Sequence, residues 1–286
     1  MIVMENVSKE YKNGVHALRD INLAIDDGEF VYIIGPTGSG KSTLIKLLDG
    51  EEIPNSGTVM VENINVGKLK HSRVPVYRRN IGVVFQDYRL LPRLTIFENI
   101  AFALEVIGMK KVDIRRRVRE VLELVSLEDK AKSFPNELSG GQQQRATIGR
   151  AIANHPKVLI ADEPTGNLDP DKSAEIMELL EKINEVEKTT VVMVTHDSTI
   201  VDRFKKRTIC LEEGYVVADI MKGGYLKHDW IFQGVPEIHK DGLFEYLSSH
   251  RHVLIGIQCS YHHTDSVFRI SDDCRKCISV YQFHRG

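Results

Sequence analysis

The sequence predicts an α/β fold that combines a parallel-sheet core, an antiparallel β subdomain and an inserted α-helical subdomain. Three observations predict it. Short apolar runs of strand length dominate the first 85 residues, helical periodicity extends from about residue 95 to 155, and apolar strands then alternate with an amphipathic helix up to residue 194. Strands that alternate with helices are typical of a parallel sheet.

Composition excludes several classes of protein. The chain has 286 residues, of which 38 are basic and 40 acidic, so no overall positive field favours nucleic acid. No apolar run is long enough to span a bilayer, and the N-terminus lacks the features of a signal peptide. Four cysteines do not resemble a disulfide scaffold. We therefore expect a cytosolic protein.

Three short strands are expected first, at residues 2–7, 16–25 and 29–34, with a turn signal at residues 26–29. The third strand leads into a glycine-rich loop and then a helical pattern from Thr43 to Leu48. Residues 54–85 are expected to continue in strands, the last of them buried.

The loop after the third strand fits G-x-x-x-x-G-K-[ST], the phosphate-binding pattern, in the strand–loop–helix context that confirms it. Glycines let backbone N–H groups surround the phosphates, and the helix N-terminus adds partial positive charge. Lys41 would reach the β- and γ-phosphates, and the Ser42 hydroxyl would ligate Mg²⁺. The predicted nucleotide-binding residues of this loop are Gly35, Pro36, Thr37, Gly38, Ser39, Gly40, Lys41, Ser42 and Thr43.

The helical stretch contains three expected helices, two of which have a recognisable N-terminal cap. Thr95 with Glu98 three residues later is a candidate capping box. Residues 111–125 carry apolar side chains at helical spacing. The third helix is expected to begin after Ser139, a natural N-cap, and to extend to about Asn154.

Two carboxylates end the apolar strand at residues 158–161. We expect Asp162 to hold Mg²⁺, directly or through water, and Glu163 to act as the general base on the attacking water. Alone, an acidic turn after a strand would be the simpler interpretation. A helix over residues 171–187 and a strand over 190–194 follow.

The run Leu138 to Arg145 reads LSGGQQQR, and with the phosphate loop and the carboxylate strand it resembles the ATP-binding cassette (ABC) ATPases over roughly residues 1–225. The resemblance implies a P-loop NTPase core, a helical subdomain at about residues 87–155, and hydrolysis of ATP with Mg²⁺. It also implies that the signature residues contact nucleotide: Ser139, Gly140, Gly141 and Gln142.

Four further positions match family elements. Gln86 resembles the Q-loop glutamine, which contacts Mg²⁺ and water; Asp169 lies in a D-loop-like Asn-Leu-Asp; and His196 resembles the switch histidine at the γ-phosphate. Tyr11 stands where the family has an aromatic that stacks on adenine. Taken singly, each residue also has an ordinary structural interpretation.

In this family the signature motif of one subunit covers the ATP of another. One phosphate loop and one signature occur here, so the resemblance implies a homodimer with two ATP molecules between its subunits. Lys41, His196 and Mg²⁺ would then surround each γ-phosphate together with the partner's signature turn.

The segment around Gln86, residues 74–104, resembles the cell-division subfamily of ABC ATPases. That implies an FtsX-like integral membrane partner, a peripheral location on the cytoplasmic face of the bacterial membrane with membrane contact through the partner, and control of peptidoglycan hydrolysis. Lipoprotein-release and macrolide-efflux ATPases share the same motifs and stay open as alternatives. A nucleotide-gated scaffold with little turnover is an alternative of another class.

Residues 226–286 form a C-terminal extension outside the family pattern. It contains Cys259 and His262, then Cys274 and Cys277, four potential zinc ligands in a C-x-x-H…C-x-x-C arrangement. A segment without any metal is the simpler expectation for this extension.

Overall fold

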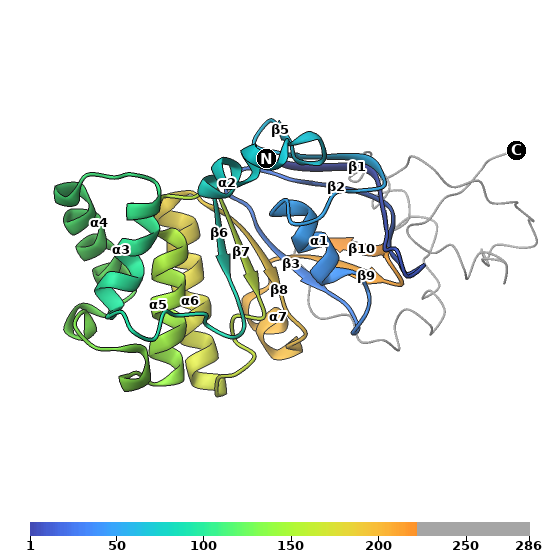
Figure 1. Ribbon diagram of the computed structural model, residues 1–286. Coiled ribbons are helices and arrows are strands. Elements are labelled where there is room, and N and C mark those ends of the chain that lie inside the picture. The colour runs from blue at the N-terminus through green and yellow to red at the C-terminus, as the bar shows by residue number, and fades with distance from the viewer. Residues whose placement is uncertain (222–286) are drawn as a thin grey trace, which may run out of the picture.

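The computed structural model describes residues 1–221, so the C-terminal extension and its candidate zinc ligands lie outside the described residues. Within that range the chain forms two sheets (Figure 1). The smaller sheet is antiparallel, in the order β2-β1-β4-β5. Its strands are β1 (Ile2–Glu10), β2 (His16–Ile25), β4 (Ser56–Val61) and β5 (Ile64–Asn65).

The larger sheet has six strands in the order β10-β9-β3-β8-β7-β6, parallel except for β10. This confirms the expected parallel core with an antiparallel subdomain. The strands are β3 (Phe30–Ile34), β6 (Ile81–Val84), β7 (Val158–Asp162), β8 (Thr190–Val194), β9 (Arg207–Glu212) and β10 (Tyr215–Ile220).

Both faces of the parallel sheet are buried, because successive side chains of a strand point to opposite faces. In β3, Val31 and Ile33 pack with α1 (Lys41–Leu48) and the antiparallel sheet. Tyr32 and Ile34 belong to the other core, which contains the remaining long helices. The sheet therefore separates α1 from those helices (Figure 1).

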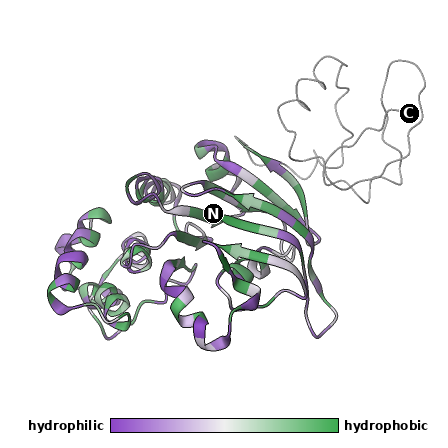
Figure 2. Ribbon diagram, turned by 90° about the horizontal axis from the view of Figure 1, so that it is seen from above, coloured by the Kyte–Doolittle hydropathy of each residue, from purple (hydrophilic) through white to green (hydrophobic). Residues whose placement is uncertain are grey.

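The helices on the second face are amphipathic, with green and purple segments alternating along them in Figure 2. The helical subdomain consists mainly of α3 and α4, which pack against each other and against α5. The bounds are α3 (Ile96–Val106), α4 (Lys111–Leu124), α5 (Gly140–Ile152), α6 (Pro170–Glu187) and α7 (Ser198–Phe204). None of the helices in residues 1–221 has the length and apolar character needed to cross a membrane.

Residues 54–85 form strands only in part. The strands β4, β5 and β6 lie in this range as expected, but residues 66–80 are not extended. Between β5 and β6 the chain forms short helical turns: η1 (Val66–Lys68), η2 (His71–Arg73), α2 (Val74–Tyr77) and η3 (Arg78–Asn80). Pro75 lies in the first turn of α2, where its missing N–H costs nothing, whereas a strand ladder would lose a hydrogen bond there. Tyr77 is buried, and its hydroxyl donates to the carbonyl of Leu48 at the end of α1.

The helix at residues 111–125 is present as α4, but its first apolar residue does not join the core. Val112 is 77 % exposed, whereas Val118, Val121 and Leu122 are buried. Burial on this helix begins only at Ile114, one turn from its start. Packing against α3 and α5 therefore involves the later turns of α4.

Candidate nucleotide-hydrolysis site

The phosphate-binding pattern forms a tight loop between β3 and α1, as the sequence predicts. Gly35 has φ +148°, and a Cβ atom there would lie 2.1 Å from the carbonyl oxygen of Leu211 on β9. No side chain fits that position, so glycine is required for the loop to leave the sheet at this point. Gly38 and Gly40 also have positive φ angles, of 81° and 106°.

Lys41, the first residue of α1, turns back toward the loop. Its Nζ donates to the carbonyl oxygens of Gly35 at 2.7 Å and of Pro36 at 2.8 Å. Partial burial lowers the pKa of Lys41, and the nearby carboxylates of Glu163 and Asp162 oppose this shift. The ammonium is therefore held at the mouth of the loop, between backbone groups and two acids.

Ser42 and Asp162 have the chemistry that Mg²⁺ prefers. The Ser42 hydroxyl is exposed at the start of α1, and Asp162 ends β7, the second neighbour of β3 in the sheet. Burial and the adjacent Glu163 raise the pKa of Asp162, and Lys41 opposes the rise. A carboxylate destabilised by burial and by a second acid is one that a cation would stabilise. The residues present fit the ion.

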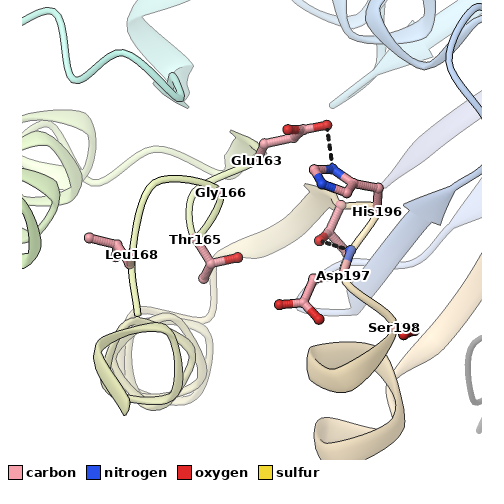
Figure 3. A pocket seen from close by; sticks show the side chains of 8 residues that line it. Glu163, Thr165, Gly166, Leu168, His196, Asp197 and Ser198 are labelled. Atoms are coloured by element: carbon pink, nitrogen blue, oxygen red, sulfur yellow. Dashed lines mark hydrogen bonds and ion pairs between the residues drawn. The ribbon is translucent and has the colours of Figure 1, made fainter. Parts of the chain in front are cut away.

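Glu163 and His196 come from neighbouring strands and meet at the carboxyl edge of the sheet (Figure 3). The Nδ1 atom of His196 lies 2.9 Å from Oε1 of Glu163. Glu163 has φ +47°, an uncommon conformation for a non-glycine residue, and its N–H donates to the carbonyl of Val194. Backbone pairing with β8 thus fixes the position of Glu163 beside His196.

Gln86 follows β6 and lies beside the turn after Glu163. A Cβ atom on Gly166 would be 3.1 Å from Nε2 of Gln86 and 3.5 Å from Oε2 of Glu163. The carbonyl of Gln86 accepts a hydrogen bond from Nδ2 of Asn167 at 3.1 Å. The structure therefore brings Gln86 to the same edge of the sheet as the candidate base.

Two predicted nucleotide contacts have local structural roles in the described residues. The Asp169 carboxylate accepts from the N–H of Lys172 at 2.9 Å and caps α6. The Tyr11 hydroxyl lies 3.3 Å from Oγ1 of Thr43 on α1, with Nζ of Lys9 5.3 Å from its ring centroid. Tyr11 is thus placed beside the helix that follows the phosphate loop.

The signature turn begins α5. Ser139 and Gln142 form a reciprocal capping box, with Ser139 Oγ accepting from the N–H of Gln142 at 3.4 Å and Gln142 Oε1 accepting from the N–H of Ser139 at 3.0 Å. Gly141 is buried, and the side chain of Lys172 lies over it. The chain does not bring this turn to its own phosphate loop, because α5 and α1 cover opposite faces of the sheet.

Several residues near the site were not predicted from the sequence. The Arg89 guanidinium lies 3.7 Å from the centroid of the Phe85 ring, and its charge favours the ionised form of Asp162. Asp197 caps α7 by accepting from the N–H of Thr199 at 2.8 Å, a role that its position before a helix could have indicated. The pocket in Figure 3 is lined by Glu163, Thr165, Gly166, Leu168, Thr195, His196, Asp197 and Ser198.

Comparison with known proteins gives a consistent result. The family model described as "ABC transporter" matches residues 18–166. A Bacillus subtilis relative, "Cell division ATP-binding protein FtsE", is 54 % identical over 229 residues, which are 80 % of this chain and 100 % of the relative. The protein with the same description from Streptococcus pneumoniae is 56 % identical over 225 residues, 79 % of this chain and 97 % of that protein.

A solved structure has the same architecture. It is described as a dimeric post-hydrolysis state of the ATP-binding cassette MJ0796 bound to ADP and Pi, and it matches with a TM-score of 0.70 and 42 % identity. The match covers 79 % of this chain and all of that one.

Proposed function

This chain belongs to the ABC transporter family and is an ATPase, and we propose that it works as a homodimer that binds two ATP molecules between its subunits within a cell-division complex. Its relatives at 54 % and 56 % identity carry the name of the cell-division ATPase FtsE. The solved cassette described as bound to ADP and Pi is dimeric, which supports the same arrangement here.

The positions of Ser139 and Lys41 on opposite faces of the sheet are the observation that supports the dimer. Ser139 starts α5, whose apolar side chains pack on one face of the parallel sheet, whereas Lys41 starts α1 on the opposite face. A single chain therefore presents a phosphate loop and a signature turn that do not meet. In a two-fold symmetric dimer each Ser139 turn would reach the nucleotide held by the partner's Lys41, so both sites are completed at once.

The chemistry then depends on position and charge. Glu163 holds the attacking water and accepts its proton, and His196 keeps the Glu163 carboxylate oriented through the 2.9 Å contact. Lys41 and the backbone N–H groups of the loop stabilise the negative charge of the leaving phosphate oxygens. Closing the dimer around nucleotide excludes bulk water, which strengthens each of these interactions.

Ser42, Asp162 and Gln86 would hold Mg²⁺ beside the β- and γ-phosphates. When bound, the ion neutralises phosphate charge and aligns the oxygens for in-line displacement. Within residues 1–221 no cluster of three acidic, histidine or cysteine side chains forms an all-protein metal site. The zinc ligands considered for the C-terminal extension lie outside the described residues.

We further propose that dimer closure is transmitted to an FtsX-like integral membrane protein and thereby controls peptidoglycan hydrolysis. On the helical subdomain, α3 exposes Phe102 by 46 % and Val106 by 61 %, and the preceding loop exposes Pro92. Leu90, by contrast, packs against the core. Apolar side chains on an exposed helix face favour a protein partner. Binding to a membrane protein through this face would place the chain at the cytoplasmic face of the membrane.

Co-purification from bacterial membranes tests this assignment. The tagged full chain is expected to recover an FtsX-like membrane protein, and Phe102→Ser is expected to reduce that recovery while the ATPase rate of the isolated protein stays unchanged. Val186→Ser is the matched control, because Val186 is 64 % exposed on α6. Recovery of a multi-span permease or a lipoprotein-release subunit instead would favour the transporter alternatives and contradict the cell-division role.

A further inference from the structure

The loop that follows Gln86, residues 87–95, is hydrogen-bonded through two side chains to α5, the signature helix, which begins with the signature turn. On α5, the single hydroxyl proton of Thr147 is shared between the carbonyl of Tyr88 and the carbonyl of Gln143 in the same helix, each 3.0 Å from Oγ1. The Arg150 guanidinium donates to the Tyr88 carbonyl at 3.0 Å and to the carbonyl of Arg89 at 2.5 Å. Thr147 and Arg150 thus contact two consecutive backbone carbonyls of the loop from one helix face.

These carbonyls belong to a strained turn. Tyr88 and Arg89 have φ angles of 55° and 49°, in the left-handed region that non-glycine residues seldom adopt. Such a conformation persists when surrounding contacts hold it. Thr147 and Arg150 supply those contacts, and Thr147 is fully buried, so its hydroxyl has no solvent to exchange with.

The same loop touches the functional end of α5. A methyl group on Gly140 would lie 3.1 Å from the Tyr88 hydroxyl oxygen, so this hydroxyl is next to the signature turn. Two residues before Tyr88, the carbonyl of Gln86 accepts a hydrogen bond from Asn167, in the turn after β7. The chain is therefore bonded to the catalytic edge of the sheet at residue 86 and to α5 at residue 88.

The far end of the loop is attached to α3. Asn99 is completely buried, its Oδ1 accepts from the N–H of Leu91 at 2.7 Å, and its Nδ2 donates to the carbonyls of Leu91, Leu94 and Thr95 at 3.0–3.1 Å. Because α3 packs on α5, residues 88–95 are tied to a pair of packed helices at both ends.

We propose that Thr147 and Arg150 are positioning residues that make the loop after Gln86 and the signature turn at Ser139 move as one body. A displacement of the loop would then be passed along α5 to the nucleotide held by the partner subunit. This inference rests on the proposed homodimer. Thr147 and Arg150 lie outside the nucleotide-binding motifs and act through Tyr88, Arg89 and the helix.

Matched substitutions separate this role from simple folding. Thr147→Val removes the hydroxyl at nearly constant volume, and Thr147→Ser keeps it; Arg150→Met removes the donors, and Arg150→Lys keeps a cation. Arg116→Met is the control for lost charge, because Arg116 is exposed and pairs with Asp113 on the same helix, α4. Each is made in the full chain and also in a Glu163→Gln background, where ATP is expected to hold the dimer.

The readouts are nucleotide affinity of the monomer, kcat and KM for ATP, ATP-driven dimerisation by sedimentation, and the temperature of unfolding. Thr147→Val and Arg150→Met are expected to bind nucleotide normally, with unchanged KM, while kcat falls and dimerisation weakens by about tenfold. Thr147→Ser is expected to behave like the parent, Arg150→Lys to recover part of the loss, and Arg116→Met to change neither quantity.

Two results would overturn the inference. In one, Thr147→Val and Arg150→Met dimerise and turn over as their parents do. In the other, their kcat losses simply follow a lower unfolding temperature and disappear on cooling, which would make the contacts structural only. If the Glu163→Gln protein itself stays monomeric with ATP, the homodimer fails, and this inference with it.

Discussion

The Nδ1 atom of His196 lies 2.9 Å from Oε1 of Glu163, although 33 positions separate the two residues in the chain. The contact exists because β7 and β8 are adjacent and parallel, with Asp162 opposite Val194. Residues that follow two neighbouring parallel strands emerge at the same edge. That edge also contains the end of β3 and the start of the phosphate loop.

Glu163→Gln is expected to bind ATP and lower kcat at least about 100-fold, because the amide cannot accept the proton of the attacking water. The variant should accumulate as an ATP-bound dimer, visible by sedimentation. Release of phosphate and nucleotide affinity are measured in parallel. Glu178→Gln, on α6 away from this edge, is the control. Hydrolysis at the parent rate would show that Glu163 is not the base.

Lys41→Ala is expected to weaken ATP binding at least about tenfold, since it removes the cation at the mouth of the loop. Calorimetric titration with ATP measures the change. Lys46→Ala serves as the comparison, because Lys46 lies on the same helix but pairs with Glu51 at 3.3 Å. Unaltered affinity in Lys41→Ala would remove the phosphate role of this lysine.

Gly35→Ala is expected to lower the free energy of unfolding by about 3 kcal/mol or more, because its methyl group would overlap the carbonyl of Leu211. Gly38→Ala introduces the same methyl group with nothing within 4 Å and should cost only about 1 kcal/mol for its positive φ. Urea unfolding without nucleotide compares them. Equal costs would mean that space at Gly35 is not limiting.

Cys210 is expected to resist alkylation in the folded protein. Burial raises the pKa of its thiol to about 11, so roughly one thiol in a thousand is ionised at pH 8. Because the pKa is raised on folding, the stability present below about pH 9 falls as pH rises toward 11, where the unfolded chain loses this proton before the folded protein does. Iodoacetamide labelling of the Cys210 peptide by mass spectrometry, with urea-unfolded protein as reference, should show at least tenfold protection. Equal labelling in both states would contradict burial.

Local patterns in the sequence predicted the local structures well. The capping box at Thr95 with Glu98 and the N-cap at Ser139 both form as expected, and Ser139 also forms a reciprocal box with Gln142 that was not predicted. The phosphate loop was predictable because its glycines and its place between strand and helix are properties of consecutive residues.

Patterns without a dominant period were less informative. The segment from Val66 to Asn80 was expected to be extended, yet it forms short helical turns around Pro75 and the buried Tyr77. The conformation of this segment depends on packing against α1, and a prediction from neighbouring residues does not include that contact. Asn99 is similar, because its four hydrogen bonds hold a loop that precedes it in the chain.

The sequence alone thus determined which chemical groups the protein has and in what order they occur, since those depend on neighbours along the chain. The tertiary structure alone decided which of them meet. Strand order placed Glu163 beside His196, and the two faces of one sheet separated Lys41 from Ser139. The physical reason is that strand pairing and core packing join residues far apart in sequence, whereas helix caps and glycine turns do not.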